Sequence, residues 1–146
     1  KRIDEENKTI KTSMIYGSQW DATLKYLVES GSKTYEEVGE DSTSWGNYIN
    51  STFEYVNESG STVTKSENSY VRIPSGSSEY TKANNIYDLA GNVFDWSVEA
   101  YGSYNRVLHG GYFNGSGATH PADLRLNFYP YYSNNYYGCR GVLYIK

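Results

Sequence analysis

The stretch IYDLAGNVFDW, residues 86–96, is the most informative part of this sequence for its architecture. Apolar and aromatic residues at both ends flank a short segment that contains Gly91 and Asn92, residue types that tight turns favour. The pattern predicts a strand, a tight turn and a second strand. Downstream, Gly102, Gly110 and Gly111 interrupt further apolar runs, so we expect this part of the chain to continue as strands and turns.

One segment upstream has the spacing of a helix. Residues 18–31, SQWDATLKYLVESG, begin with a residue type that caps helices, Ser18, and end with Gly31, a residue type that stops them. The apolar residues that share its predicted buried face are Trp20, Leu24, Leu27 and Val28. We therefore expect a helix packed by one side against a sheet.

Several shorter elements complete the prediction. Residues 34–40, TYEEVGE, can form a helical turn, and residues 52–65 alternate around a polar turn as a β-hairpin does. SYVRI, residues 69–73, is typical of a short strand, and CRGVLYIK, residues 139–146, of a strand inside the sheet.

Composition restricts the class of protein. A chain of 146 residues fits one domain, residues 1–146, although 17 tyrosines make its core unusually aromatic. A net charge of −4 argues against a nucleic-acid partner, and no apolar run is long enough for membrane insertion. The single cysteine, Cys139, excludes an internal disulfide.

Three blocks of sequence resemble the formylglycine-generating-enzyme, or sulfatase-modifying-factor, family. They are IYDLAGNVFDW (86–96), RVLHGG (106–111) and GCRGVLYIK (138–146). The resemblance implies a C-type-lectin-like fold of the α+β class, with short antiparallel strands, one main helix and much irregular structure. Because domains of that family are usually longer upstream, we expect an N-terminal part to be missing here.

The residues that the family's oxidase members use for catalysis are not present in this sequence. The family's two copper-binding cysteines correspond to positions near Gly115 and His120, and neither residue is cysteine. Two histidines, His109 and His120, are too few for a three-ligand metal site, and Cys139 is expected to be a packed thiol. We predict that the chain is not an enzyme; the alternative is a metal-dependent oxidoreductase of the formylglycine-generating-enzyme class.

One inorganic site is implied by the family's calcium-binding members. Transferred to this sequence, its ligands are the side chain of Asp88, the backbone carbonyls of Gly91 and Val93, and the carboxylate of Asp95. Asp95 replaces the family's usual glutamate and is one methylene shorter. Alternatively, the two aspartates cap the amides of the turn. No cofactor is otherwise required, and the candidate cofactor is a structural calcium ion.

The composition changes at the C-terminal end. Residues 107–145 contain no Lys, Glu, Gln, Met or Trp, although these five types supply 23 of the first 106 residues. None of the five has a codon that ends in a pyrimidine, which is expected where AAC or AAT codons have been mutated at their adenines. The region thereby resembles the variable region of the variable proteins of diversity-generating retroelements; the alternative is that an aromatic surface loop lacks these residues for packing reasons.

Tyrosine gives a binding surface a large rigid contact area at a low entropy cost, while Ser, Gly and Asn adapt around it. We therefore expect residues 107–145 to present a ligand-binding surface for a protein or glycan receptor, displayed on a virion tail or a bacterial surface, outside the cell. A homo-oligomer or attachment to a larger assembly is consistent with this role, whereas Arg125 and Arg140 are expected to be structural. The candidate contact residues are Tyr112, Phe113, Thr119, His120, Asp123, Leu124, Leu126, Asn127, Phe128, Tyr129, Tyr131, Tyr132, Asn135, Tyr136 and Tyr137.

Overall fold

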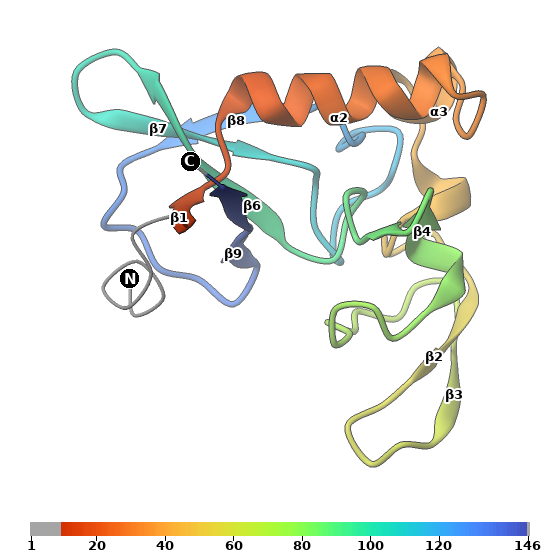
Figure 1. Cartoon of the computed structure of the whole chain (residues 1–146). Coiled ribbons are helices and arrows are strands. Elements are labelled where there is room, and N and C mark those ends of the chain that lie inside the picture. Colours follow the sequence, from red (N-terminus) through yellow and green to blue (C-terminus); the bar gives the residue numbers. More distant parts are fainter. Residues whose placement is uncertain (1–9, 146) are drawn as a thin grey trace.

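A single long helix, α2 (Gly17–Glu29), packs along a four-stranded sheet in the computed structural model, which describes residues 10–145 (Figure 1). This mixed α+β arrangement of one main helix and short strands confirms the expected class at that level. The other elements, in chain order, are β1 (Ile10–Met14), α3 (Tyr35–Gly39), η1 (Thr43–Trp45), β2 (Phe53–Val56), β3 (Thr62–Lys65), η2 (Glu79–Thr81), β4 (Lys82–Ala83), β5 (Ile86–Tyr87), β6 (Phe94–Tyr101), β7 (Asn105–His109), β8 (Arg125–Phe128), β9 (Tyr137–Cys139) and β10 (Gly141–Ile145).

Helix α2 begins two residues earlier than predicted, and Ser18 does not cap it. Tyr16 is the N-cap, and its backbone N–H donates to the side-chain oxygen of Gln19 at 2.9 Å. Ser18 therefore lies within the first turn. The predicted end is confirmed, because Gly31 follows the helix with a φ of 71°. Trp20 and the leucines of the predicted face are buried, so hydrophobic burial holds the helix on the sheet.

The four-stranded sheet has the order β8-β7-β6-β9. Strand β6 pairs antiparallel with β7 on one side and parallel with β9 on the other (Figure 1). Its pairing with β7 shifts register between Trp96 and Ala100, which marks a bulge. The pairing with β9 covers only Phe94 to Trp96, so β9 leaves the farther part of this edge of β6 uncovered.

The last strand is not inside the four-stranded sheet, and that prediction is wrong. Strand β10 instead pairs antiparallel with β1, Met14 opposite Gly141, in a separate two-stranded sheet. The preceding segment, β9, already occupies the edge of the sheet beside β6. In addition, the N–H of Ile15 donates a hydrogen bond to the carbonyl of Arg140, and this bond directs the chain toward β1. Leu143 consequently remains exposed.

The predicted hairpin and short helical turn are confirmed as β2–β3 and α3, but SYVRI is not a strand. Side-chain amides take the place of a neighbouring strand there. The side chain of Asn47 donates to the carbonyl of Val71, and the side chain of Asn92 both accepts from the N–H of Ile73 and donates to its carbonyl. These bonds satisfy the backbone without a sheet.

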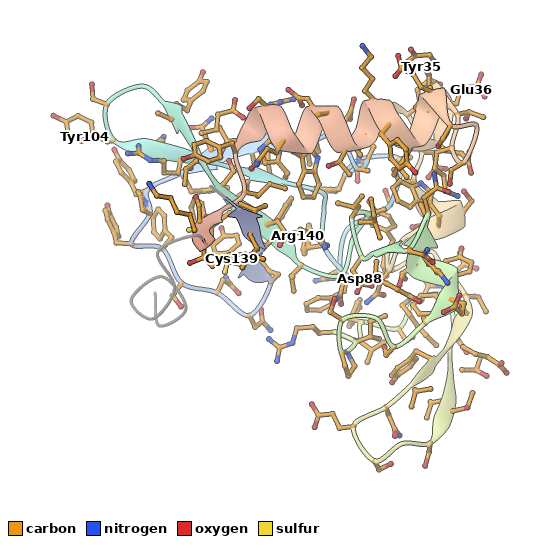
Figure 2. The ribbon with its side chains drawn as sticks, in the orientation of Figure 1. Tyr35, Glu36, Asp88, Tyr104, Cys139 and Arg140 are labelled. Carbon is orange, nitrogen blue, oxygen red and sulfur yellow. The ribbon has the colours of Figure 1, made fainter. Side chains whose placement is uncertain are left out.

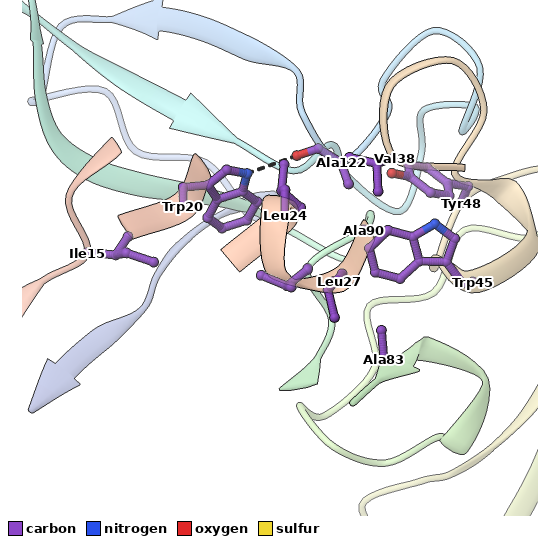
Figure 3. Close-up of a cluster of buried hydrophobic side chains, with 11 residues drawn as sticks. Ile15, Trp20, Leu24, Leu27, Val38, Trp45, Tyr48, Ala83, Ala90 and Ala122 are labelled. Atoms are coloured by element: carbon purple, nitrogen blue, oxygen red, sulfur yellow. Dashed lines mark hydrogen bonds between the residues drawn. The ribbon is translucent and has the colours of Figure 1, made fainter. Parts of the chain in front are cut away.

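The largest side chains of the core are aromatic, and the core lies between α2 and the turn that follows β5 (Figure 3). Trp20, Trp45 and Tyr48 are almost completely buried, and each places its polar atom on a backbone carbonyl. The Trp20 indole N–H, for example, donates to the carbonyl of Ala122 at 3.0 Å. Each ring therefore contributes burial without leaving an unpaired donor.

Replacing Gly111 with alanine is expected to cost about 2 kcal/mol more than replacing Gly102. Both glycines have positive φ, 77° and 66°, so alanine is strained at either position. Only at Gly111 would the new Cβ lie 2.3 Å from a backbone oxygen, that of His120. Urea unfolding followed by tryptophan fluorescence measures the difference, and equal losses would show that the backbone at residue 111 can shift.

Candidate ligand-binding surface

Three exposed tyrosines follow strand β8. Tyr129, Tyr131 and Tyr132, here called the tyrosine cluster, are 41%, 76% and 50% exposed. The rings of Tyr129 and Tyr131 stack with centroids 5.3 Å apart, and Tyr131 and Tyr132 are 5.2 Å apart. None of the three hydroxyls bonds another residue within the described part of the chain. The cluster thus presents preformed aromatic area with hydroxyls available to a ligand.

Half-buried rings support the tyrosine cluster from below. Tyr137 contacts Trp96 at 5.6 Å and Phe128 at 6.0 Å between centroids, and Tyr136 contacts Tyr112 at 5.2 Å. Tyr136 and Tyr137 are therefore partly packed, unlike the exposed Tyr131 and Tyr132. The reason is a long-range strand pairing, because Tyr137 begins β9 and lies opposite Phe94 of β6.

These rings form one continuous band across the molecule. Tyr112 stacks on Phe94 at 5.0 Å and meets the His120 ring at 5.1 Å, so the loop before β8 and the loop after it are joined through aromatic contacts. Phe128 continues the contacts to Tyr132 at 6.2 Å. The aromatic band, as we call it, consists of His120, Tyr112, Phe94, Tyr136, Tyr137, Phe128, Tyr132, Tyr129 and Tyr131.

Other candidate contact residues lie apart from the band or beneath it. Phe113 is buried, and its N–H donates to the carbonyl of Asn92. Asp123 is tied to the region of α3 through its own N–H, which bonds the carbonyl of Val38. Thr119 is exposed and bonds the ring of His120, and Asn135 is exposed beside Arg72. Leu124 and Leu126 are half-buried.

A small cavity opens beside the tyrosine cluster. It has a volume of about 310 Å³, and its lining includes Asn105, Asn127 and the rings of Tyr129 and Tyr132. The side-chain amide of Asn105 donates to that of Asn127 at 2.7 Å, which fixes both amides at the cavity. Asn105 was not among the sequence candidates because it precedes residue 107. The sequence feature that could have indicated it is a polar residue at the start of a strand.

The candidate calcium loop already contains a cation. The Nε of Arg140 donates to the carboxylate of Asp95 at 2.5 Å, and its guanidinium also donates to the carbonyl of Asp88 (Figure 2). The Asp88 carboxylate accepts bonds from Ser75 and Gly76. Calcium at Asp95 would require Arg140 to leave, so these residues do not fit the metal in this arrangement. The calcium site stays a prediction.

Burial dominates the electrostatics of this pair. It raises the pKa of Asp95 to about 6, even though the neighbouring Arg140 acts in the opposite direction. Arg125, in contrast, pairs with the exposed Asp21 on α2 at 2.5 Å. Both arginines therefore pair with acidic side chains, but only Arg140 holds a buried one; Arg125 pairs at the surface of α2.

Within residues 10–145, no group of three or more His, Cys, Asp or Glu side chains is placed to hold a metal ion. Of the positions that correspond to the copper cysteines, Gly115 is buried and His120 belongs to the aromatic band. Cys139 is exposed, so the expectation of a packed thiol is wrong. No helix in the described part of the chain is long and apolar enough to cross a membrane.

No protein-family model and no curated protein sequence matches the chain. Among solved structures, the chain is similar to "Treponema denticola variable protein 1", with a TM-score of 0.52 and 18% sequence identity. The match covers 89% of this chain and 46% of that structure, so the chain spans less than half the length of its structural relative. At this identity the likeness is one of fold: the chain has the mixed α+β fold of a variable protein, consistent with the C-type-lectin-like expectation.

Proposed function

We propose that this chain is a non-catalytic ligand-binding domain. The aromatic band, which includes the tyrosine cluster, recognises a protein or glycan receptor. The observation that carries the proposal is the tyrosine cluster, three rings that touch one another yet remain exposed. Exposed rings contribute little to the stability of a fold, whereas aromatic residues dominate the energetics of binding surfaces.

The scaffold suits a variable surface. The cluster lies on the segment between β8 and β9, and both strands pair with the core strands β6 and β7. Side chains on that segment can change while the strands beneath keep their pairing. The likeness in fold to a variable protein and the absence of five residue types from residues 107–145 support diversification of this surface by a retroelement.

Display on a virion tail or a bacterial surface follows as part of the proposal. A diversified binding surface is useful where it meets the receptors of another cell or particle. We propose that it acts there as a part of a larger assembly or as a homo-oligomer. Its net charge of −4 does not favour nucleic acid as the partner.

Alanine substitution of the tyrosine cluster, Y129A/Y131A/Y132A, is expected to leave the free energy of unfolding within about 1 kcal/mol of the wild type, because exposed rings contribute little to stability. The same variant should lose the wild-type signals on a glycan array or an array of bacterial surface proteins. The matched control is Y26A/Y35A/Y70A, which removes three exposed tyrosines elsewhere and should retain those signals. Equal binding by both variants would exclude the cluster as the recognition surface.

The origin of the surface is tested in the DNA. A near-copy of the region that encodes residues 107–145, differing at adenines and lying beside a reverse transcriptase gene, is the expected finding. A gene neighbourhood with neither a near-copy nor a reverse transcriptase gene would count against diversification. The binding role is tested separately, by the array experiment.

A further inference from the structure

A second, larger cavity lies apart from the tyrosine cluster. It is a groove of about 670 Å³ lined by residues of β1, β6 and β9, among others, and is here called the β1–β9 groove. Figure 1 shows these three strands, and Figure 2 labels Cys139, which lines the groove. It exists because β9 covers β6 only as far as Trp96, while β1 approaches β6 farther along through the Val98 N–H, which bonds the carbonyl of Ile15. The half-buried Trp96 and Val98 of β6 form its floor.

The walls of this groove are largely apolar. Trp96 and Val98 come from β6, Met14 from the end of β1, and Tyr137 from β9. The rings of Trp96 and Tyr137 meet edge to face with centroids 5.6 Å apart. Most binding sites for small molecules have a volume in this range and combine aromatic walls with few polar groups.

Among residues 10–145, Arg106 is the one charged residue that lines the β1–β9 groove. Within the described residues, the guanidinium of Arg106 donates one hydrogen bond, to the backbone carbonyl of Asn105. It forms no ion pair with a described acidic side chain. Arg125 and Arg140, in contrast, are both paired with aspartates. Arg106 therefore keeps donors available beside an apolar surface, an arrangement that suits a carboxylate or sulfonate group.

We propose that the β1–β9 groove binds an aromatic monoanion, whose ring lies against Trp96 and Val98 and whose acid group pairs with Arg106. The site goes beyond the receptor-binding function. Trp96, Val98 and Arg106, the residues assigned to the ring and the acid group, precede residue 107, so they stay the same when residues 107–145 vary. The rest of the lining includes Pro130, Tyr137, Gly138 and Cys139, which lie within that region. Tyr137 is the one ring that the groove shares with the aromatic band.

The probe is 1-naphthaleneacetate, compared with its uncharged amide, 1-naphthaleneacetamide. In titrations followed by two-dimensional amide NMR, the acid is expected to shift the signals of Met14, Trp96, Val98 and Cys139 and to bind at least about 10-fold more tightly than the amide. Arg106→Gln should abolish that preference. Lys25→Gln, which removes the same charge from the exposed face of α2, should retain it.

Alkylation of Cys139 by N-ethylmaleimide gives a second readout, because this exposed thiol lines the groove. The acid should slow alkylation of Cys139 in the wild type and in Lys25→Gln but not in Arg106→Gln. If Arg106→Gln does not fold, Arg106→Met takes its place. Equal affinity for acid and amide in the wild type, a preference retained without Arg106, or shifts confined to other residues would each overturn the proposal. Y129A/Y131A/Y132A should bind the acid normally, so failure of the receptor-binding role is distinguishable from failure of this one.

Discussion

Replacing Arg140 with methionine is expected to lower the free energy of unfolding by about 3–5 kcal/mol. The guanidinium lies 2.5 Å from the carboxylate of Asp95, which is only 5% exposed, and it also satisfies the carbonyl of Asp88. Methionine retains the packing volume but leaves a buried carboxylate without its cation. Because burial already raises the pKa of Asp95 to about 6 with Arg140 present, that pKa should rise further in the variant.

Arg125→Met is the matched control. It also breaks an arginine–aspartate pair at 2.5 Å, but there Arg125 is 40% and Asp21 54% exposed, so the expected loss is below about 1 kcal/mol. Adding Asp95→Asn to Arg140→Met should recover part of the stability, because the buried charge is then gone. Similar losses for the two arginine variants would mean that the buried pair is not a principal link between the turn and the last strand.

The same variants test the calcium prediction. If calcium binds at Asp95, it has to compete with Arg140, and the wild type should unfold at a higher urea concentration with calcium chloride than with EGTA. Equal midpoints in the wild type, with a calcium effect only in Arg140→Met, would show that the guanidinium takes the place of the metal.

Local chemistry explains why the turn after Ile86 and Tyr87 could be predicted from sequence. Asp88, Gly91 and Asn92 all adopt positive φ, between 58° and 70°, and these are residue types that tolerate it. The same holds for the apolar face of α2 and the glycine that follows it. Such turns and helix faces depend on residues that are close in the sequence, so the sequence alone predicts them.

The remaining features depend on contacts between residues far apart in the sequence. The apolar run at the C-terminus reads as an inner strand, yet its partner is β1, more than a hundred residues away. In the candidate site, residue type alone does not separate the exposed Tyr131 from the half-buried Tyr137, because the difference comes from the pairing of β9 with β6. The groove beside Arg106 likewise arises where three distant strands meet.

Acidification from pH 6.5 to pH 4 is expected to remove about 3 kcal/mol of stability through His109. The ring is fully buried and stacks on Trp20 at 5.0 Å. Burial, reinforced by the positive charge of Arg125, lowers the pKa of His109 to about 4. Below pH 6.5 the unfolded chain therefore binds a proton that the native protein does not. The stabilisation is complete above pH 6.5 and is lost as the pH approaches 4.

His109→Phe isolates this effect, because phenylalanine keeps the stack on Trp20 but cannot titrate. The difference in unfolding free energy between wild type and variant should change by about 3 kcal/mol over that window. The raised pKa of Asp95 acts in the opposite direction, but it is common to both proteins and cancels. Two acidic groups act against this effect. The charge of Asp21 raises the pKa of His109, and the carboxylate of Glu99 lies 3.5 Å from the Nε2 of His109, where a protonated ring can pair with it. Parallel curves for the two proteins would mean that this ion pair offsets the cost of burying the charge, so the buried histidine would be charged rather than neutral at low pH.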